Sequence, residues 1–259
     1  MSKTALITGA TSGIGAAYAK RLASQGYDLI LTGRRQEIIK KLGDDLAKQF
    51  NIKVEIIIAE LSDDSDIQKV VDAIKIAENL EILINNAGYG FTPMMFDEND
   101  LGKQEKMTKV LLTVPMRLIY AALPEMTKKR RGTIINVSSQ GAYLPSRKMA
   151  VYAASKAFLK SFTESLYMEI KDKGIKVQVV CPGIIKTDFY RYFTTEAKAS
   201  WFKAFKVVTP PELVVDCSLK DLEKHRVVCI PGAYTKRMMT LVSILPRSYV
   251  YKMAERYNY

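Results

Sequence analysis

Cysteine and histidine are scarce in this chain of 259 residues. Its three cysteines (Cys181, Cys217 and Cys229) are scattered without a Cys-x-x-Cys pair, and His225 is the single histidine. A disulfide framework is therefore not expected, and no metal site is predicted. A serine–histidine–carboxylate triad is also not expected, because the single histidine, His225, stands in a charged stretch typical of solvent-exposed surface. This cysteine usage fits a reducing cytoplasm.

Long apolar runs are missing as well. No uncharged apolar stretch approaches the roughly 18 residues that a membrane-spanning helix needs. The amino terminus passes from Met1-Ser2-Lys3 directly into a strand-like segment, unlike a signal peptide. We therefore expect a protein that is neither secreted nor membrane-spanning and that is located in the cytoplasm. A chain of 259 residues can bury a complete α/β core within one domain, 1–259.

Acidic residues are outnumbered by basic ones. The chain has 39 lysines and arginines against 27 aspartates and glutamates, which gives a formal net charge of +12. Such an excess could serve nucleic acid, an anionic membrane surface, or an anionic substrate or cofactor. The densest basic run, 128–131, lies between a predicted helix and a predicted strand, where basic residues also complement a helix dipole. Because no nucleic-acid-binding motif accompanies the charge, nucleic acid is not an expected partner.

Short β-branched runs alternate with longer amphipathic segments along the sequence. Strands are predicted at Thr4–Thr8, Asp28–Thr32, Lys53–Ala59, Glu81–Asn85, Thr133–Ser138, Lys176–Cys181 and Val227–Ile230. Helices are predicted at about 13–25, 35–49, 64–78, 99–128, 150–173 and 210–223. The alternation predicts a Rossmann-type α/β fold, a doubly wound parallel seven-stranded sheet with helices on both faces. Such sheets bind ligands beyond the carboxyl ends of their strands.

A glycine-rich turn follows the first predicted strand and opens the first predicted helix. Its spacing is Gly-x-x-x-Gly-x-Gly, not the more common Gly-x-Gly-x-x-Gly. Without side chains, backbone N–H groups at a helix amino terminus can approach a pyrophosphate. The predicted cofactor-binding residues of the turn are Gly9, Thr11, Ser12, Gly13, Ile14 and Gly15. A glycine-rich turn without a ligand is the alternative interpretation.

Two arginines follow the second predicted strand. NAD-binding folds usually carry an acidic residue there for the adenosine ribose, but this chain has Gly33, followed by Arg34 and Arg35. A guanidinium suits a 2′-phosphate, which a carboxylate would repel. NADP(H) is therefore the predicted cofactor. The alternative is a pair of solvated arginines at a helix start, although helix amino termini do not favour cations.

Tyr152 and Lys156 stand four residues apart on a predicted helix, so both side chains should face one cleft. A cation about 4 Å from a phenol, at an effective dielectric constant of about 20, favours the phenolate by ~4 kcal/mol, about three pH units before desolvation. Tyr152 is thus predicted to exchange a proton near neutral pH. An ordinary exposed helical pair is the alternative.

Further motifs follow later strand ends. They are Asn85-Asn86-Ala87-Gly88 after the fourth strand, Ser138-Ser139 after the fifth and Pro182-Gly183-Ile184-Ile185-Lys186-Thr187 after the sixth. Together with the glycine-rich turn and Tyr152-x-x-x-Lys156, they resemble the classical short-chain dehydrogenase/reductase family, and the arginines resemble those of its NADP-preferring members. The resemblance covers residues 3–232.

This resemblance implies a role for each matching residue. Ser139 would polarise the substrate carbonyl, Tyr152 would be the general acid/base, and Lys156 would hold the nicotinamide ribose while lowering the pKa of the phenol. Thr187 would contact the carboxamide. Cofactor contacts are also implied for Glu60, Leu61, Asn86, Ala87, Gly88, Pro182, Gly183 and Ile185. The asparagine-containing motif also has a structural interpretation, as amides that join neighbouring strands.

Two positions depart from the family pattern. Leu111 stands where the family usually has an asparagine that helps to seat a water on the proton path from the lysine. Backbone carbonyls or Thr113 could serve that path instead. Glu60 replaces the usual aspartate near the adenine, and its additional methylene shifts the acceptor. Neither departure removes the predicted reacting groups.

The motifs together predict NADPH-dependent reduction of a ketone or 3-oxoacyl carbonyl to an alcohol, with Tyr152 as the general acid. Residues 186–209 are predicted to form a substrate lid. The lid contains the aromatic residues Phe189, Tyr190, Tyr192, Phe193, Trp201, Phe202 and Phe205, and the basic residues Arg191, Lys198, Lys203 and Lys206. The aromatic surface favours a bulky hydrophobic substrate, and the basic residues could tolerate an anionic carrier. Lid packing or a subunit contact would explain the aromatic residues equally well.

Residues 232–259 form a basic C-terminal extension with interleaved apolar residues. An interfacial membrane helix, a cover over the substrate pocket and a subunit contact are all compatible with it. Pro246 would interrupt a membrane helix, so membrane contact is not the favoured interpretation. The resemblance implies a homodimer or homotetramer. Two rival functions stay open: an NADP(H)-binding sensor with little turnover, suggested by Leu111, and a membrane- or partner-associated scaffold.

Overall fold

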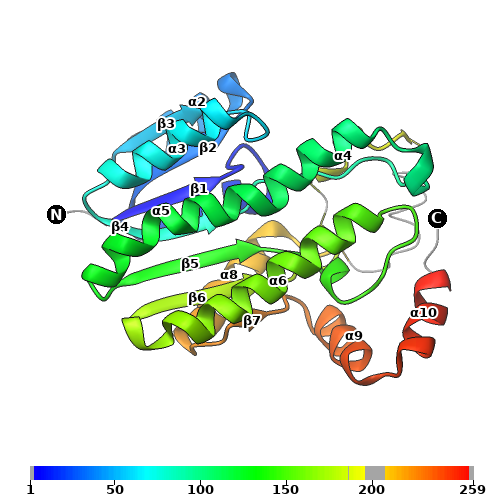
Figure 1. Cartoon of the computed structure of the whole chain (residues 1–259). Coiled ribbons are helices and arrows are strands. Elements are labelled where there is room, and N and C mark those ends of the chain that lie inside the picture. Colours follow the sequence, from blue (N-terminus) through cyan, green and yellow to red (C-terminus); the bar gives the residue numbers. More distant parts are fainter. Residues whose placement is uncertain (1–2, 186, 196–207, 257–259) are drawn as a thin grey trace.

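A parallel sheet forms the centre of the structure, a computed structural model that describes residues 3–185, 187–195 and 208–256 (Figure 1). Its strands are β1 (Thr4–Thr8), β2 (Asp28–Gly33), β3 (Val54–Ile58), β4 (Leu80–Asn85), β5 (Gly132–Val137), β6 (Ile175–Val180) and β7 (Val228–Cys229). They lie in the order β3-β2-β1-β4-β5-β6-β7 and pair in parallel. The predicted seven-stranded, doubly wound sheet is therefore confirmed.

Helices cover both faces of this sheet. They are α1 (Gly13–Ser24), α2 (Gln36–Phe50), α3 (Asp64–Ile76), α4 (Leu101–Thr108), α5 (Val114–Lys128), α6 (Ala150–Ile170), α8 (Pro211–Glu223), α9 (Ala233–Ile244) and α10 (Arg247–Arg256). Along β1, Ala5 and Ile7 pack with α1, α2 and α8 on one face, while Leu6 packs with α3, α5 and α6 on the other. This alternation follows from the period of two of a β-strand, and it explains why the buried strands are apolar on both faces.

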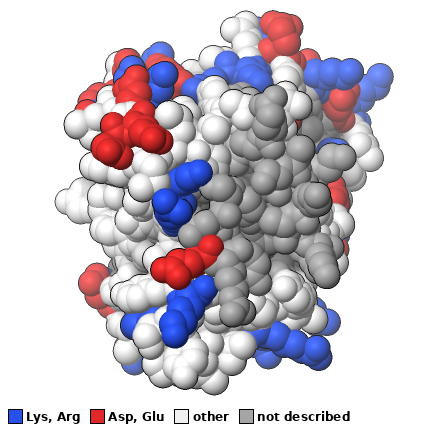
Figure 2. All heavy atoms as spheres, turned by 90° about the vertical axis from the view of Figure 1, so that its right-hand side faces the viewer, with Lys and Arg blue, Asp and Glu red and all other residues white. Residues whose placement is uncertain are grey.

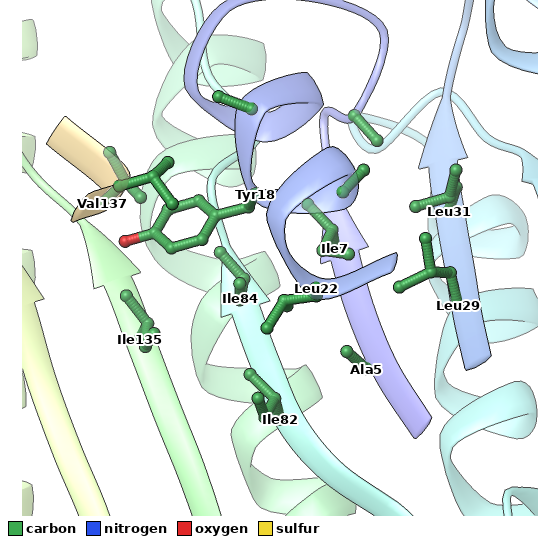
Figure 3. Close-up of a cluster of buried hydrophobic side chains, with 14 of the residues drawn as sticks. Ala5, Ile7, Tyr18, Leu22, Leu29, Leu31, Ile82, Ile84, Ile135 and Val137 are labelled. Atoms are coloured by element: carbon green, nitrogen blue, oxygen red, sulfur yellow. The ribbon is translucent and has the colours of Figure 1, made fainter. Parts of the chain in front are cut away.

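Tyr18 of α1 anchors that helix to the sheet. Its ring is fully buried above β4 and points toward β5, among Ile84, Ile135 and Val137 (Figure 3). The hydroxyl donates to Ser218 Oγ of α8 at 2.6 Å, and Ser218 is in turn hydrogen-bonded to Gln178 Oε1 of β6 at 2.5 Å. Burial raises the pKa of Tyr18, so the phenol stays neutral. This buried series of hydrogen bonds fixes the position of α1, whose first turn carries the glycine-rich motif.

The helix predicted over 99–128 is not one regular helix. Between α4 and α5 the backbone makes a π-helical turn, η2 (Lys109–Thr113), which the sequence periodicity does not predict. Such turns insert an extra residue into a helix and often occur at functional sites. Leu111 lies in the middle of this turn and is buried.

The continuous helical run Leu101–Lys128 is long and apolar enough to cross a membrane, by length and composition alone. This finding qualifies the expectation that the chain does not span a membrane. Its 28 residues include an apolar window that is 44% buried in the fold. Val114, Leu118 and Ala122 of α5 belong to the core cluster that packs against α3, β4 and α6. A buried core helix passes the same test, so the composition of this run is weak evidence for a membrane span.

The C-terminal extension forms two helices beyond the carboxyl ends of the strands, at the right of Figure 1. Pro246 follows the end of α9 and precedes α10, as its missing N–H and fixed φ predict. Met239 of α9 and Val250 of α10 are buried in a small cluster that includes Tyr143 and Leu144 from the loop after β5. The extension thus packs against the edge of the sheet where parallel folds bind ligands.

The same end of the molecule faces the viewer in Figure 2. On the described part of this face, basic and acidic side chains are interspersed. The net charge of +12 is therefore not gathered into one continuous basic patch there.

Candidate active site

A cavity of about 770 Å³ opens beyond the carboxyl ends of the strands, within the usual size range of small-molecule sites. It brings together the residues that the motifs single out from distant parts of the sequence. Those that line it are Gly9, Thr11, Ser12, Gly13, Ile14, Arg34, Arg35, Glu60, Leu61, Asn86, Ala87, Gly88, Ser139, Tyr152, Lys156, Pro182, Gly183, Ile185 and Thr187. Gly15 is the one predicted site residue that does not line the cavity.

The glycine-rich turn needs its glycines for close approach. Gly9 and Gly13 have positive φ values of 66° and 56°, which residues with a Cβ rarely adopt. A Cβ on Gly9 would lie 2.8 Å from Ala87 Cα, and one on Gly13 would lie 2.8 Å from Thr187 Cγ2. Gly15 instead packs against the Gly9 carbonyl, where a Cβ would clash. Gly15 therefore lets the turn close on its own backbone, while Gly9 and Gly13 allow close contact with Ala87 and Thr187 in the cavity wall.

Asn86 joins the ends of β1 and β4. Its Nδ2 donates to Thr8 O at 2.9 Å and to Gly9 O at 3.1 Å. Thr8 Oγ1 accepts from the backbone N–H groups of Asn86 and Ala87 at 3.0 and 2.9 Å. These bonds match the structural interpretation of the asparagine-containing motif. They also hold Ala87 and Gly88 at the cavity wall.

Arg34 is held between two elements at the far end of the cavity. Its Nη1 donates to Glu60 Oε2 at 2.6 Å, and its Nη2 donates to the Tyr192 hydroxyl at 3.0 Å. The guanidinium also lies 5.4 Å from the centroid of the Tyr89 ring, in cation–π range. Partial burial opposes ionisation of Glu60, but its hydrogen bonds to Arg34 and Ser62 outweigh burial and lower the pKa of the carboxyl. The site therefore carries an ion pair here, not two free arginines.

Arg35 is positioned by the glycine-rich turn. Its Nη2 donates to Thr11 Oγ1 at 2.8 Å and to Ser12 Oγ at 2.9 Å, and its Nη1 forms an ion pair with Asp188. The motifs do not predict Asp188, although it directly follows Thr187. The segment before Asp188 is irregular, so no regular spacing of residues in the sequence shows which way the Asp188 side chain points.

Lys156 reaches the cavity from the interior of α6. It is only 4% exposed, and its Nζ donates to Val137 O at 2.9 Å. The Nζ atom lies 5.8 Å from the centroid of the Tyr152 ring, so the two side chains share the cavity as the four-residue spacing predicts. Burial lowers the pKa of the Lys156 ammonium to about 8. The amine can therefore change its charge closer to neutral pH than a solvated lysine.

Ser139 stands next to Tyr152 in the wall of the cavity. Its Oγ accepts from Gly141 N at 3.1 Å. A Cβ on Gly141 would lie 3.5 Å from Ser139 Oγ and 3.8 Å from Tyr152 Cε1, so both side chains border the space beside Gly141. Ser138 is buried, and its hydroxyl donates to Lys156 O at 2.8 Å. Ser138 thus supports α6, whereas Ser139 lines the cavity with a hydroxyl that accepts from Gly141 N and retains its own proton to donate.

Leu111 lies beside Lys156, at the position that departs from the family pattern. A Cβ on Gly88 would meet Leu111 Cδ2 at 2.9 Å and Lys156 Nζ at 3.8 Å. The leucine methyl therefore packs over Gly88 close to the ammonium. An apolar group at this place adds to the desolvation of Lys156 and offers no hydrogen bond to a water.

The other end of the cavity is lined mainly by apolar side chains that no motif predicts. They come from the loop after β5 and from α9 and α10: Leu144, Pro145, Met149, Tyr234, Met238, Met239 and Ala254, with Ser146 and Arg147 among them. Phe189 also lines this region, with its ring centroid 5.3 Å from that of Tyr152. Phe193 is buried against Met149.

Part of the predicted lid lies outside the described residues. Trp201, Phe202, Phe205, Lys198, Lys203 and Lys206 fall there, as do Lys186 and the side chains of Tyr190 and Arg191. Within the described ranges, no group of three or more histidine, cysteine, aspartate or glutamate side chains is placed to hold a metal ion.

Comparison with known proteins places these features in context. The family model described as short chain dehydrogenase matches residues 3–198. The chain is 31% identical over 259 residues to the very-long-chain 3-oxoacyl-CoA reductase of Anas platyrhynchos, a match over 98% of this chain and 79% of that protein. It is also 30% identical over 198 residues to the inactive hydroxysteroid dehydrogenase-like protein 1 of Homo sapiens, covering 76% of this chain and 60% of that protein.

A solved structure has the same fold over nearly the whole chain. The short-chain dehydrogenase from Sphingobium yanoikuyae in complex with NADPH superposes with a TM-score of 0.82 at 29% sequence identity, over 94% of this chain and 96% of that one.

Proposed function

The chain belongs to the short-chain dehydrogenase family, and from that premise we propose that it reduces a ketone or 3-oxoacyl carbonyl to an alcohol with NADPH. Members of this family are oxidoreductases that act on CH–OH or C=O groups with a nicotinamide cofactor. One observation carries the proposal: Tyr152 and Lys156, close to each other, line one cavity together with the glycine-rich turn and with apolar side chains of α9. A dinucleotide beside the turn and a carbonyl compound beside the apolar side chains would both reach the phenol.

The residues present fit a dinucleotide. The turn at Gly9 and Gly13 would hold the pyrophosphate against the amino terminus of α1. An ammonium has three N–H donors, and because Val137 O takes one from Lys156, two remain for the hydroxyls of the nicotinamide ribose. Thr187, next to Gly13, would contact the carboxamide. When bound, the reduced nicotinamide supplies the hydride that the carbonyl carbon accepts.

The protein's own contribution is the proton. Tyr152 would give its hydroxyl proton to the carbonyl oxygen as negative charge develops there, and Ser139 Oγ would donate a hydrogen bond to the same oxygen. The phenolate that remains would be stabilised by the Lys156 ammonium and reprotonated through it. Because the pKa of Lys156 is about 8, the amine can lose and regain a proton without a strongly basic medium.

The proton must then return from solvent by a path that differs from the usual family arrangement. Leu111 cannot seat a water through its side chain, and its methyl group packs beside Lys156. The hydrogen bond from Lys156 to Val137 O holds the ammonium at the end of β5, where water held only by backbone carbonyls would supply the proton. We infer that this path is slower than one through a water that a side chain at position 111 also holds.

NADPH is preferred over NADH in this proposal because Arg34 and Arg35 line the cavity at the end of β2. Their present partners, Glu60 and Asp188, are carboxylates, which a 2′-phosphate would replace or share. The S. yanoikuyae structure, which contains NADPH, gives independent support from a relative. The proposal includes a homodimer or homotetramer in the cytoplasm, with 186–209 as lid and 232–259 as an extension of the same domain.

The decisive experiment follows NADPH consumption with a panel of bulky hydrophobic ketones, 3-oxoacyl thioesters and small diketones. Turnover of at least one carbonyl compound, faster with NADPH than with NADH, is expected. NADPH binding without turnover across the panel would favour the sensor function. The similarity to a human protein whose name includes the word inactive is the reason to test for this outcome. Liposome sedimentation that depends on residues 232–259 would favour the scaffold.

A further inference from the structure

Among the residues that the structure describes, four cationic side chains line the cavity, and they differ in their partners. Arg34 and Arg35 are paired with Glu60 and Asp188, the two carboxylates of the lining. Lys156 is buried and donates to the Val137 backbone carbonyl. The fourth cation, Arg147, lines the cavity too, and no acidic side chain among the lining residues is left for it.

Arg147 lies in the loop between the short helix after Ser139 and the start of α6. Its side chain is exposed, and within the described residues it has neither an ion pair nor a hydrogen bond. The loop on both sides of it is anchored: Leu144 packs into the cluster of α9 and α10, and Met149 packs against Phe193. The backbone of Lys148 is tied by a hydrogen bond from Met94 N at 3.1 Å. The anchored loop thus places the Arg147 cation among the largely apolar residues that line the cavity.

We propose that the substrate of this site is a carbonyl compound with an apolar body and an anionic end group, and that Arg147 binds the anion. The inference rests on the proposed function and specifies its substrate class. A guanidinium binds a carboxylate or phosphate through paired N–H donors, which sets both affinity and orientation. The apolar residues Leu144, Met149 and Met238 would contact the body of the substrate between its two polar ends.

The position of Arg147 also limits the length of that body. Arg147 and Tyr152 are five positions apart in the sequence, so their Cα atoms are at most ~18 Å apart, at ~3.6 Å per extended residue. A carbonyl at the Tyr152 hydroxyl and an anion at the guanidinium can therefore belong to one medium-length chain. The anion could be the carboxylate of a free oxo acid or a phosphate of an acyl carrier, because both offer oxygen pairs of the same geometry.

The test compares substrates that differ only in charge. Turnover by the wild-type protein with NADPH is measured for a medium-chain oxo acid, its uncharged methyl ester and its coenzyme A thioester. We expect kcat/KM to be about tenfold higher for at least one anionic form than for the ester, and the preference to shrink as salt is raised. A preference for the acid identifies a carboxylate, and one for the thioester alone identifies the carrier phosphates.

Variants then assign the preference to one residue. Arg147→Gln should bring the ratio of the anionic substrate to the ester close to one. Lys148→Gln removes the neighbouring cation, which does not line this cavity, and should keep the wild-type ratio. Equal turnover of acid, thioester and ester by the wild type overturns the inference, and so does an unchanged ratio in Arg147→Gln with a normal unfolding temperature.

Failure of the proposed function would look different. If no carbonyl compound is turned over, the binding of the oxo acid, the thioester and the ester to the protein saturated with NADP⁺ is measured by calorimetry instead. Weaker binding of the acid or the thioester, but not of the ester, to Arg147→Gln still supports the anion site. Equal binding by wild type and variant overturns it.

Discussion

The two ends of the cavity are built in different ways. The cofactor end consists of main chain, glycines and short side chains at the ends of β1, β2 and β4, and its arginines are paired with carboxylates of the protein. The substrate end consists of apolar side chains from a loop, the segment around Phe189 and the helices α9 and α10, and its arginine is unpaired within the described residues. Strand geometry fixes the first end, and long-range packing fixes the second.

This difference indicates how one fold can retain its chemistry while its substrates change. The proposed reacting groups, Tyr152, Lys156 and Ser139, line the same cavity, on α6 and just after β5. Changes at these three residues should abolish turnover, changes at the substrate end should alter stability and substrate affinity, and changes at the cofactor end should alter cofactor preference. Four substitutions test this division.

The largest effect is expected for Tyr152→Phe. Removal of the hydroxyl eliminates the general acid, so kcat/KM should fall by about 10²–10⁴-fold, while NADPH affinity stays within a few-fold of wild type. Steady-state kinetics and fluorescence titration of NADPH measure the two quantities. Tyr143→Phe is the matched control, since Tyr143 lies in the loop before α6 but does not line the cavity, and it should retain activity. Full activity in Tyr152→Phe would show that the general acid is misassigned.

Met239→Ala tests the substrate end. Met239 is 3% exposed and forms a small cluster with Val242 and Val250, so its truncation should lower the free energy of unfolding by about 2–3 kcal/mol, at the lower end for buried methionines. KM for a bulky ketone should rise, and NADPH affinity should stay unchanged. The exposed Met168, on the outside of α6, provides the control, and Met168→Ala should change stability by less than about 0.5 kcal/mol. A loss of NADPH affinity in Met239→Ala would contradict the separation of the two ends.

Lys156→Met should remove activity and yet stabilise the protein. Burial lowers the pKa of Lys156 from 10.5 to about 8, a difference worth ~3 kcal/mol at ~1.36 kcal/mol per unit, part of which the lost hydrogen bond to Val137 O offsets. We expect a gain of about 1–2 kcal/mol at pH 7 by urea unfolding. Between pH 8 and 10.5 the unfolded wild-type chain binds more protons than the folded one, so wild-type stability should rise with pH and the gain should shrink.

The control for this substitution lies one turn along the same helix. Lys160 is more exposed and forms an ion pair with Glu164, so Lys160→Met should bring no stabilisation. If Lys156→Met destabilises the folded protein at pH 7, the buried ammonium is better compensated than its surroundings indicate.

The smallest effect is expected for Arg34→Ala at the cofactor end. Loss of one charge-assisted contact to the 2′-phosphate should lower kcat/KM for NADPH by about tenfold, ~1.4 kcal/mol, and leave the value for NADH nearly unchanged. Competition assays with the two cofactors report the ratio directly. Arg21→Ala, which breaks a surface ion pair with Asp216 away from the cavity, should not change it. An equal loss for both cofactors would mean that Arg34 does not distinguish them.

The sequence predicts the cofactor end better than the substrate end for a physical reason. Glycines at fixed offsets from a strand end, such as Gly9 and Gly13, mark a backbone conformation that few other residues adopt. The four-residue spacing of Tyr152 and Lys156 likewise places both on one side of a helix without any tertiary information. The alternation of strands and helices predicts the sheet, whose order then brings these residues together.

Other features depend on contacts between distant segments. The ion pairs of Arg34 with Glu60 and of Arg35 with Asp188 join residues far apart in the sequence, and no local pattern encodes them. The π-helical turn around Leu111 also leaves the apolar periodicity nearly intact, so 99–128 looks like one helix. The cluster that brings Met239 to Leu144 arises from the path of the extension.

Transfer of deuterium from NADPH that carries deuterium at both positions of its hydride-donating carbon tests the central claim most directly. With a ketone that the protein turns over, we predict one deuterium at the carbinol carbon of the alcohol for each NADPH consumed, and a loss of this transfer in Tyr152→Phe. Oxidation of NADPH without deuterium in the alcohol, or equal transfer by the variant, would contradict the account.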